Sequence, residues 1–154
     1  MHYFSTNRTS AHASFRDAVL NGQPSDKCLC FPSYIPKLAP EFIEALQGLS
    51  NEQIAFDVIR PFVDGEIPDE TLCEICRETV NFSFPLVEIS DRISTLELFH
   101  GPTLAFKDVG AWFMSRCLRY FSRDNNAKTI LVVATSGDTG GAVAAGFHGV
   151  EGIE

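Results

Sequence analysis

The sequence has no excess of basic residues, no long apolar run and no internal repeat. Its 12 Lys and Arg are outnumbered by 20 Asp and Glu, which gives a net charge of −8. This balance excludes a nucleic-acid-binding surface, because such surfaces need clustered positive charge. No stretch has the length and apolarity of a membrane span, and the N-terminus carries no signal-peptide pattern. We therefore expect a cytoplasmic protein that acts on small molecules, with no nucleic acid, membrane or obligate protein partner.

The cysteine pattern argues against disulfides. The five cysteines are odd in number, which favours reduced thiols in a cytosolic protein. Cys28-x-Cys30 and Cys73-x-x-Cys76 leave a four-thiolate zinc site as an alternative. However, Cys73 and Cys76 lie on a helical apolar pattern with Leu72 and are better interpreted as core side chains. The sequence therefore predicts no metal site.

What is present is enough apolar material for a core: 45% of the residues are hydrophobic, and 13 are phenylalanine. In 154 residues this suits one domain or slightly more. Residues 1–80 have a mainly helical pattern that prolines interrupt. Ser50 or Asn51 can cap one helix, and Asp69 can start another.

The pattern changes from Pro85 onward. Short alternating strands are predicted over 86–89 and 96–99, followed by a helix over 107–122, a strand over 129–134 and a helix over 139–148. This order is that of an α/β fold with a doubly wound, mostly parallel sheet. We therefore predict a helical region over 1–84 and the beginning of an α/β domain over 85–154.

Lys107 starts the 107–122 helix, and its neighbours suggest a chemical role. A lysine amine is protonated at neutral pH, so it must be desolvated or neutralised before it can form a Schiff base. Phe106, Trp112 and Phe113 are candidates for the apolar surroundings. The alternative is an ordinary solvated lysine, which gains nothing from the positive end of a helix dipole.

The segment 132–141 offers a complementary feature, because an apolar strand there runs into a glycine-rich turn. Residues 130–134 are continuously apolar, as in a parallel strand that is buried on both faces. A helix N-terminus that follows such a strand is a natural anion site. Asp138 or Thr139 as a simple N-cap is the alternative. The turn lacks both the Gly-Lys-Ser/Thr of a nucleotide P-loop and the GxGxxG fingerprint.

These two segments, ELFHGPTLAFKDVG (97–110) and ATSGDTGG (134–141), resemble the threonine synthase family of fold-type II pyridoxal-phosphate enzymes. The opening Tyr3-Phe4-Ser5-Thr6 and residues 55–76 are similar to the bacterial and fungal branch of that family. The likeness covers nearly the whole chain and suggests that it corresponds to the N-terminal portion of the enzyme. Residues 25–31 depart from it, because Ser-Asp-Lys-Cys replaces the usual Asp-Gly-Gly turn.

The resemblance implies a carbon–oxygen lyase that converts O-phospho-L-homoserine and water to L-threonine and phosphate. It implies that pyridoxal 5′-phosphate is bound covalently by Lys107, beside Phe106, and that Lys107 later moves protons. Asp138 stands where many relatives carry Asn facing the cofactor's phenolic oxygen; because a carboxylate can only accept, it would favour a different cofactor tautomer. The implied substrate ligands are the carboxylate-binding Thr135, Ser136, Gly137 and Thr139, together with His100 and Thr103 near the substrate phosphate.

Two alternatives stay open from the sequence. One is another lyase or dehydratase of the same cofactor family that acts on a different amino acid. The other is an inactive N-terminal fragment, because the family's cofactor-phosphate loop and ring-nitrogen partner are not in this sequence. We expect the 154-residue chain alone to be inactive. For His100, a hydrogen-bonded loop histidine is favoured over a catalytic acid.

Overall fold

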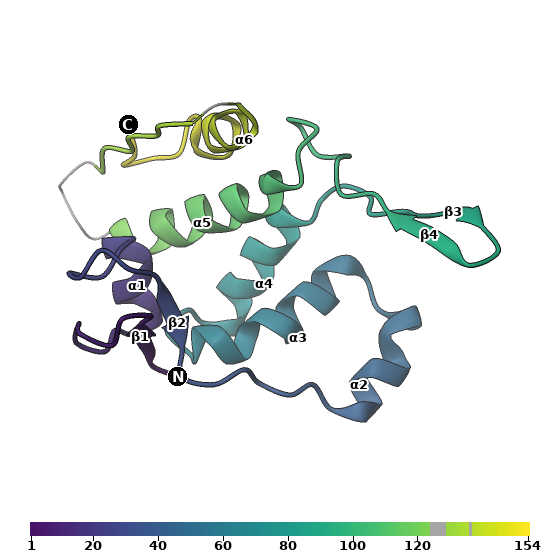
Figure 1. The fold of residues 1–154 in the computed structure, drawn as a ribbon, viewed down its shortest axis with the longest axis horizontal. Coiled ribbons are helices and arrows are strands. Elements are labelled where there is room, and N and C mark those ends of the chain that lie inside the picture. The colour runs from purple at the N-terminus through teal and green to yellow at the C-terminus, as the bar shows by residue number, and fades with distance from the viewer. Residues whose placement is uncertain (124–128, 136) are drawn as a thin grey trace. The chain divides into compact units, whose positions relative to one another are not determined.

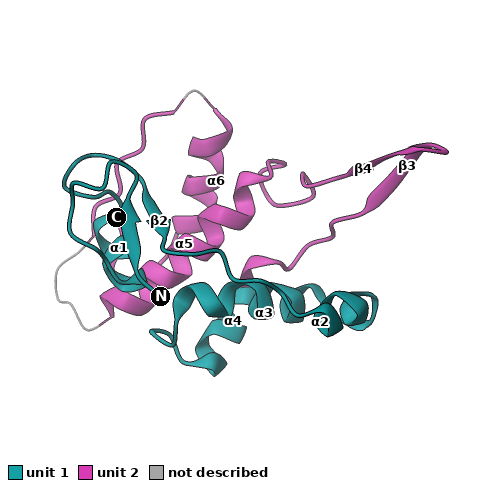
Figure 2. Ribbon diagram, turned by 60° about the horizontal axis from the view of Figure 1, so that its bottom comes forward, with its two compact units in different colours: residues 1–76 teal, residues 77–154 magenta. Residues whose placement is uncertain are grey.

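The structure is a computed structural model that describes residues 1–123, 129–135 and 137–154. The chain forms two compact units, Met1–Cys76 and Arg77–Glu154, and the boundary falls within one helix (Figures 1 and 2). The domain boundary predicted after residue 84 stays a prediction. No helix in the described part of the chain combines the length and the apolarity that crossing a membrane requires.

Unit 1 contains a small antiparallel sheet that the helical pattern of the sequence did not predict. Strand β1 (Tyr3–Ser5) pairs with β2 (Cys30–Pro32), so that Tyr3 faces Pro32 and Ser5 faces Cys30. The Tyr3 backbone also exchanges hydrogen bonds with Ala13 at 2.8 and 2.9 Å. Strands of three residues are too short to show an alternating pattern, so only the pairing of distant segments reveals them.

The remaining elements of unit 1 are helical, as predicted. They are α1 (Phe15–Asn21), α2 (Pro40–Ala45) with the 3₁₀ turn η1 (Leu46–Gly48), α3 (Asn51–Val63) and α4 (Asp69–Thr79). The predicted Ser50 cap is confirmed: its hydroxyl accepts from the Gln53 amide at 3.3 Å, and the Gln53 side chain accepts from the Ser50 amide at 2.9 Å. The predicted start of a helix at Asp69 is also confirmed.

The buried residues of α4 follow one helical stripe. Leu72, Ile75, Cys76 and Thr79 are at most 3% exposed and have the spacing i, i+3, i+4, i+7. Cys73 is exposed. The prediction that both cysteines are core side chains is therefore right for Cys76 and wrong for Cys73, because residue 73 lies about 100° around the helix from Leu72.

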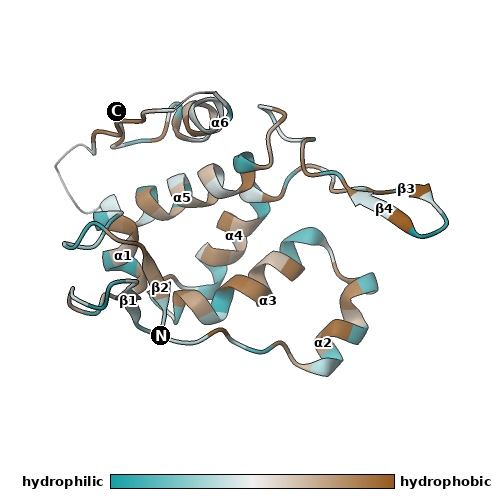
Figure 3. Cartoon of the chain, in the orientation of Figure 1, coloured by the Kyte–Doolittle hydropathy of each residue, from teal (hydrophilic) through white to brown (hydrophobic). Residues whose placement is uncertain are grey.

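Unit 2 begins with a hairpin of β3 (Leu86–Ser90) and β4 (Ile93–Leu96), in which Leu86 faces Leu96. The strand predicted over 86–89 is confirmed. The strand predicted over 96–99 is wrong, because the turn after Ser90 folds the chain back at once and the partner strand is over by Leu96. Every residue of both strands is exposed, although Figure 3 colours much of the hairpin as hydrophobic.

Two helices dominate the rest of unit 2. Helix α5 spans Lys107–Ser122, as predicted, and α6 spans Asp138–Phe147, one residue from its predicted position. The two helices pack against each other where Gly146 lies on Ala111 and Trp112. The buried residues of the two helices include Cys117, Leu118, Ala142 and Phe147, all at most 8% exposed.

The strand predicted over 129–134 is only partly formed. Thr129 pairs with Ile153 in the parallel direction. The Thr129 amide donates to the Gly152 carbonyl at 2.8 Å, and the Thr129 carbonyl accepts from the Glu154 amide at 2.9 Å. Burial on both faces is wrong, because Ile130 is 73% exposed. Within the described residues this segment has a pairing partner on one edge only, whereas a buried parallel strand needs neighbours on both. The fold is an incomplete α/β domain.

Candidate functional site

Lys107 is the first residue of α5 and is half-buried. Its Nζ lies 5.6 Å from the centroid of the Phe106 ring. None of the ion pairs among the described residues includes Lys107, so no carboxylate occupies its amine. The expected apolar shielding by Phe106 is weaker than predicted, since Phe106 is 63% exposed. The amine is therefore placed at a helix start where a reactant can reach it.

The loop before Lys107 is fixed to the first turn of α5 by a fully buried carboxylate. Asp108 accepts the Thr103 amide at 2.9 Å on one oxygen and the Thr103 hydroxyl at 2.5 Å on the other. An anion at this position is also favoured by the positive end of the helix dipole. The hydroxyl of Thr103 was predicted to face substrate phosphate. In this structure it donates a hydrogen bond to Asp108.

Gly101 lies against the same carboxylate and is buried. A Cβ at this residue would stand 2.5 Å from Asp108 Oδ2 and 3.0 Å from the Phe82 ring. Only glycine therefore allows the backbone to approach Asp108 this closely. Neither role was predicted from the sequence, although an aspartate in the first turn of a predicted helix is a recognisable signal for an N-terminal interaction.

His100 is held by its neighbours at the start of this loop. Its Nε2 lies 2.6 Å from Glu97 Oε2, and its ring stacks on Phe99 with the centroids 4.9 Å apart. It is thus a hydrogen-bonded loop histidine, which is the interpretation favoured from the sequence. A role toward substrate phosphate stays a prediction.

The glycine-rich turn stands at the N-terminus of α6, as predicted. The N-cap is Gly137, whose carbonyl accepts the Gly141 amide at 3.2 Å, while Asp138 and Thr139 are the first two helical residues. The alternative of Asp138 or Thr139 as the N-cap is therefore wrong. The first amides of a helix have no acceptor within it, so this end can bind an anion. Ser136 lies outside the described residues.

Thr135 folds over this turn. Its Oγ1 accepts the Gly137 amide at 3.3 Å, and its methyl group occupies the space that a Cβ of Gly140 would need. Thr135, Gly137, Asp138 and Thr139 are all exposed. Hydroxyls and amides at the turn thus remain accessible to a ligand.

An arginine joins the helices that carry Lys107 and the turn. The Arg116 guanidinium donates to the Gly146 carbonyl at 2.9 Å, pairs with Glu78 at 2.7 Å and stacks 4.3 Å above the Trp112 ring. Burial raises the pKa of Glu78, but the Arg116 hydrogen bond and the charges of Arg119 and Arg116 outweigh that effect and hold it below its ordinary value. A carboxylate that keeps its charge strengthens this junction.

The helix crossing relates the two predicted segments. Lys107 lies four residues before Ala111, about one helical turn, and Asp138 lies eight residues before Gly146, a little over two turns. Lys107 and the glycine-rich turn thus lie on two helices that pack against each other. It does not bring Phe106 or His100 into contact with the turn in any described interaction.

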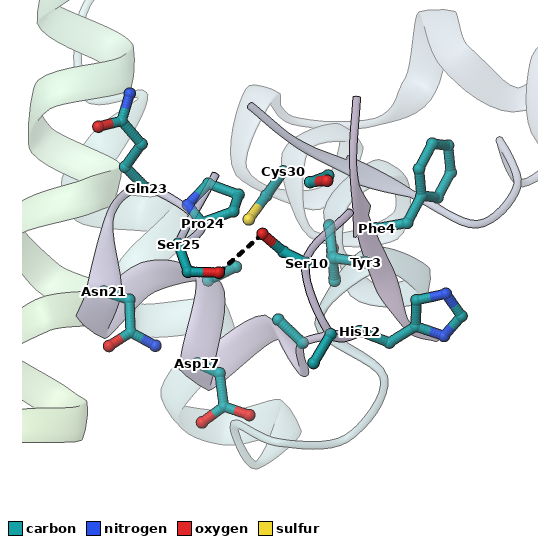
Figure 4. A pocket seen from close by; sticks show the side chains of 14 residues that line it. Tyr3, Phe4, Ser10, His12, Asp17, Asn21, Gln23, Pro24, Ser25 and Cys30 are labelled. Carbon is teal, nitrogen blue, oxygen red and sulfur yellow. Dashed lines mark hydrogen bonds between the residues drawn. The ribbon is translucent and has the colours of Figure 1, made fainter. Parts of the chain in front are cut away.

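A separate cavity of about 490 Å³ lies in unit 1 (Figure 4). Polar and apolar residues both line it, and a 2.9 Å hydrogen bond joins two of them, Ser10 and Ser25. None of the predicted site residues lines it. No group of three or more His, Cys, Asp or Glu side chains in the described ranges is arranged to hold a metal ion.

Comparison with known proteins supplies an independent observation. Residues 2–80 match the family model described as threonine synthase N terminus. The chain is 38% identical to a threonine synthase of Haemophilus influenzae over 153 residues, which is 99% of this chain and 35% of the relative. It is 36% identical to the Escherichia coli threonine synthase over 141 residues, covering 92% of this chain and 32% of the relative.

Solved structures agree with the sequence matches. A PLP-bound threonine synthase from Brucella melitensis superposes with a TM-score of 0.93 at 38% identity, over 100% of this chain and 34% of that protein. The yeast threonine synthase gives a TM-score of 0.86 at 34% identity, over 99% and 34% respectively. The chain therefore spans about a third of the length of the relatives that it matches.

Proposed function

Because the chain belongs to the threonine synthase family, we propose that, as part of a protein with the full length of its relatives, it serves to convert O-phospho-L-homoserine and water to L-threonine and phosphate with pyridoxal 5′-phosphate as cofactor. The observation that carries this proposal is the position of Lys107. Its amine, which has no ion-pair partner among the described residues, lies at the start of α5, and α5 packs against α6, the helix that begins with the glycine-rich turn.

The residues present fit such a cofactor. Schiff-base formation needs a reachable amine that is not held in its protonated form by a carboxylate, and Lys107 is half-buried and outside the described ion pairs. Asp138, in the first turn of α6, would face the phenolic oxygen and can only accept a hydrogen bond there when ionised. When bound, the cofactor supplies the electron sink that permits proton removal from the α and β carbons of the substrate.

The chain's own residues would hold the substrate and move its protons. Lys107 Nζ would accept and return protons beside the cofactor. The amides and hydroxyls of Thr135, Ser136, Gly137 and Thr139 would bind the substrate carboxylate at the start of α6. His100 would stand near the substrate phosphate, where Glu97 fixes the orientation of its ring. The sequence assigns the same place to Thr103, whose hydroxyl is engaged by Asp108.

The first test is chemical trapping of the lysine. The chain is incubated with pyridoxal 5′-phosphate, reduced with borohydride and mapped by peptide mass. We expect the adduct to concentrate on Lys107 and to disappear in Lys107→Ala. Lys27 and Lys37 are exposed and serve as controls within the same molecule. An adduct that is spread evenly over these lysines would contradict the proposal.

A second test addresses the substrate. Phosphate release and amino-acid products are measured with O-phospho-L-homoserine, serine and threonine in a cofactor-loaded protein that contains this chain and has the full length of its relatives. Threonine formed only from O-phospho-L-homoserine supports the proposed reaction. Breakdown of serine or threonine to a keto acid would instead support a dehydratase of the same cofactor family.

A further inference from the structure

Asp108 is an unusual residue for its environment, because its carboxyl group is fully buried and no ion pair among the described residues includes it. Removing a carboxylate from water is costly unless hydrogen bonds replace the lost hydration. Both of its oxygens are engaged by Thr103, one by the amide and one by the hydroxyl. The buried Asp108 carboxyl group therefore needs the hydrogen bonds of the loop that precedes Lys107, and the same hydrogen bonds hold that loop in place.

Three further contacts show how tightly the loop is fixed. The Gly101 backbone lies against Asp108 and the Phe82 ring. The Leu104 amide donates to the Gly101 carbonyl at 3.1 Å, and the Asp108 amide donates to the Ala105 carbonyl at 3.1 Å. The chain from Gly101 to the first turn of α5 is thus a continuous series of hydrogen-bonded turns.

Leu104 carries backbone strain within this series. Its φ is 58°, in the left-handed region that a bulky residue rarely adopts, and its side chain is 74% exposed. An exposed side chain gains little from burial, so packing of Leu104 does not explain the conformation. Strain of this kind persists only where surrounding contacts impose it. The contacts of Gly101 and Thr103 with Asp108 are the ones that hold both ends of the turn.

We propose that Asp108 is a positioning residue that anchors the 101–106 loop to α5 and thereby fixes the direction in which Lys107 presents its amine. Thr103 belongs to this anchor through its amide and its hydroxyl. This proposal rests on the proposed function in one respect only, namely that the positioned Lys107 amine serves to bind the cofactor. The anchor itself rests on the two hydrogen bonds, the close approach of Gly101 and the strained Leu104.

A carboxylate suits the anchor because the Thr103 amide and hydroxyl both donate to it, and an ionised acceptor makes stronger hydrogen bonds. An ionised carboxylate accepts on both oxygens, whereas an asparagine accepts on one and donates from the other. In Asp108→Asn, the side-chain oxygen can still accept the Thr103 amide and the side-chain nitrogen can donate to the Thr103 hydroxyl, but the negative charge that strengthens both contacts is lost. Thr103→Val removes the hydroxyl at nearly constant volume, and Thr103→Ser keeps it and serves as the matched control.

The experiment compares these variants in hydrogen exchange followed by NMR. We expect the Leu104 amide to exchange about tenfold faster in Asp108→Asn, which loses the charge on the acceptor, and in Thr103→Val, which loses one hydrogen bond to a charged group. The double variant should exchange no faster than the faster single variant, since the two residues act as one unit. Thr103→Ser should match the parent, and amides of unit 1 should not change in any variant.

A second readout follows the amine without any cofactor. Reductive methylation of Lys107 is measured relative to the exposed Lys27 and Lys37. In the parent, Lys107 should react more slowly because it is half-buried; in Asp108→Asn and Thr103→Val its relative rate should rise about threefold. The share of borohydride-trapped cofactor on Lys107 should fall in the same two variants and not in Thr103→Ser.

The proposal is overturned by unchanged Leu104 exchange in Asp108→Asn, by effects that multiply in the double variant, or by an unchanged relative methylation rate of Lys107. Failure of the proposed function is a different result. It would appear as a parent chain whose cofactor adduct shows no preference for Lys107, while exchange and methylation still report on the anchor.

Discussion

Gly146 lies directly on the backbone of Ala111, and this contact sets how closely α6 approaches α5. A Cβ at residue 146 would stand 3.1 Å from the Ala111 carbonyl carbon and 3.2 Å from both its oxygen and Trp112 Cδ1. These are backbone and ring atoms, which cannot rotate away as the end of a flexible side chain does. The separation of the helices that carry Lys107 and the glycine-rich turn thus depends on one missing side chain.

The first prediction follows from this contact. Gly146→Ala should lower the free energy of unfolding by about 1–3 kcal/mol, because overpacking forces the helices apart. Gly141→Ala is the matched control in the same helix, since nothing lies within 4 Å of its Cβ position. It should raise stability by about 0.5–1 kcal/mol through helix propensity. Urea unfolding measures both, and equal effects of the two variants would contradict the packing.

The second prediction concerns Gly101. Gly101→Ala should destabilise unit 2 by about 1–3 kcal/mol, because the new methyl group would meet the buried Asp108 carboxylate and the Phe82 ring. Gly110→Ala, in open space within α5, should instead stabilise it by about 0.5–1 kcal/mol. Thermal unfolding of the two variants and the parent measures these changes in stability. A Gly101→Ala chain as stable as the parent would show that the loop does not need this close approach.

The third prediction is a pH dependence in unit 1. The hydrogen bond from Ser5, reinforced by Thr9, Cys28 and Ser10 against a smaller opposing effect of desolvation, lowers the pKa of Asp26 from 3.8 to about 2. A carboxyl whose pKa is lowered by folding contributes stability that is fully present above its unfolded pKa and is lost as the pH falls through the folded value. The stability advantage of the parent over Asp26→Asn should therefore be constant above about pH 5 and shrink between about pH 4 and 2.

NMR titration of the Asp26 carboxyl measures this pKa directly. Ser5→Ala is the matched variant, because it removes the donor with the largest effect and should move the pKa upward. An Asp26 carboxyl that titrates near its ordinary value in the parent would contradict the hydrogen-bond network.

The fourth prediction separates two cysteines on one helix. Burial, reinforced by the neighbouring Cys73, raises the pKa of Cys76 to about 11, and Cys76 is fully buried, whereas Cys73 is exposed. Because the thiolate is the reactive form, iodoacetamide at neutral pH should modify Cys73 at least about tenfold faster. Peptide mass mapping over time measures the rates. Similar rates for the two thiols would place the buried face of α4 elsewhere.

Local features of the structure were predictable from the sequence. The Ser50 cap, the start of α4 at Asp69 and the limits of α5 all follow from residues within one or two helical turns. The same holds for the glycine-rich turn at the start of α6. Such features depend on backbone amides and side chains that are close in sequence, so their chemistry is visible in the residue pattern.

Features that join distant segments were not predictable. The pairing of Tyr3–Ser5 with Cys30–Pro32 leaves no periodic pattern in three residues. The strand expected over 129–134 has the composition of a buried strand, yet burial depends on neighbours that composition does not specify. The position of β4 was not predictable for the same reason. The turn after Ser90 and the pairing with β3 set where β4 lies, and pairing register depends on both strands together.

The sequence by itself determined that Lys107 begins an amphipathic helix and that a glycine-rich turn begins another, because helix caps and periodicity are local. It also carried the motifs by which the family is identified. Only the tertiary structure decided that Asp108 is buried under Thr103 and Gly101, and that Gly146 and Arg116 join α6 to α5. Those contacts depend on which backbone segments approach within a few ångströms, and close approach is settled by packing of the folded chain.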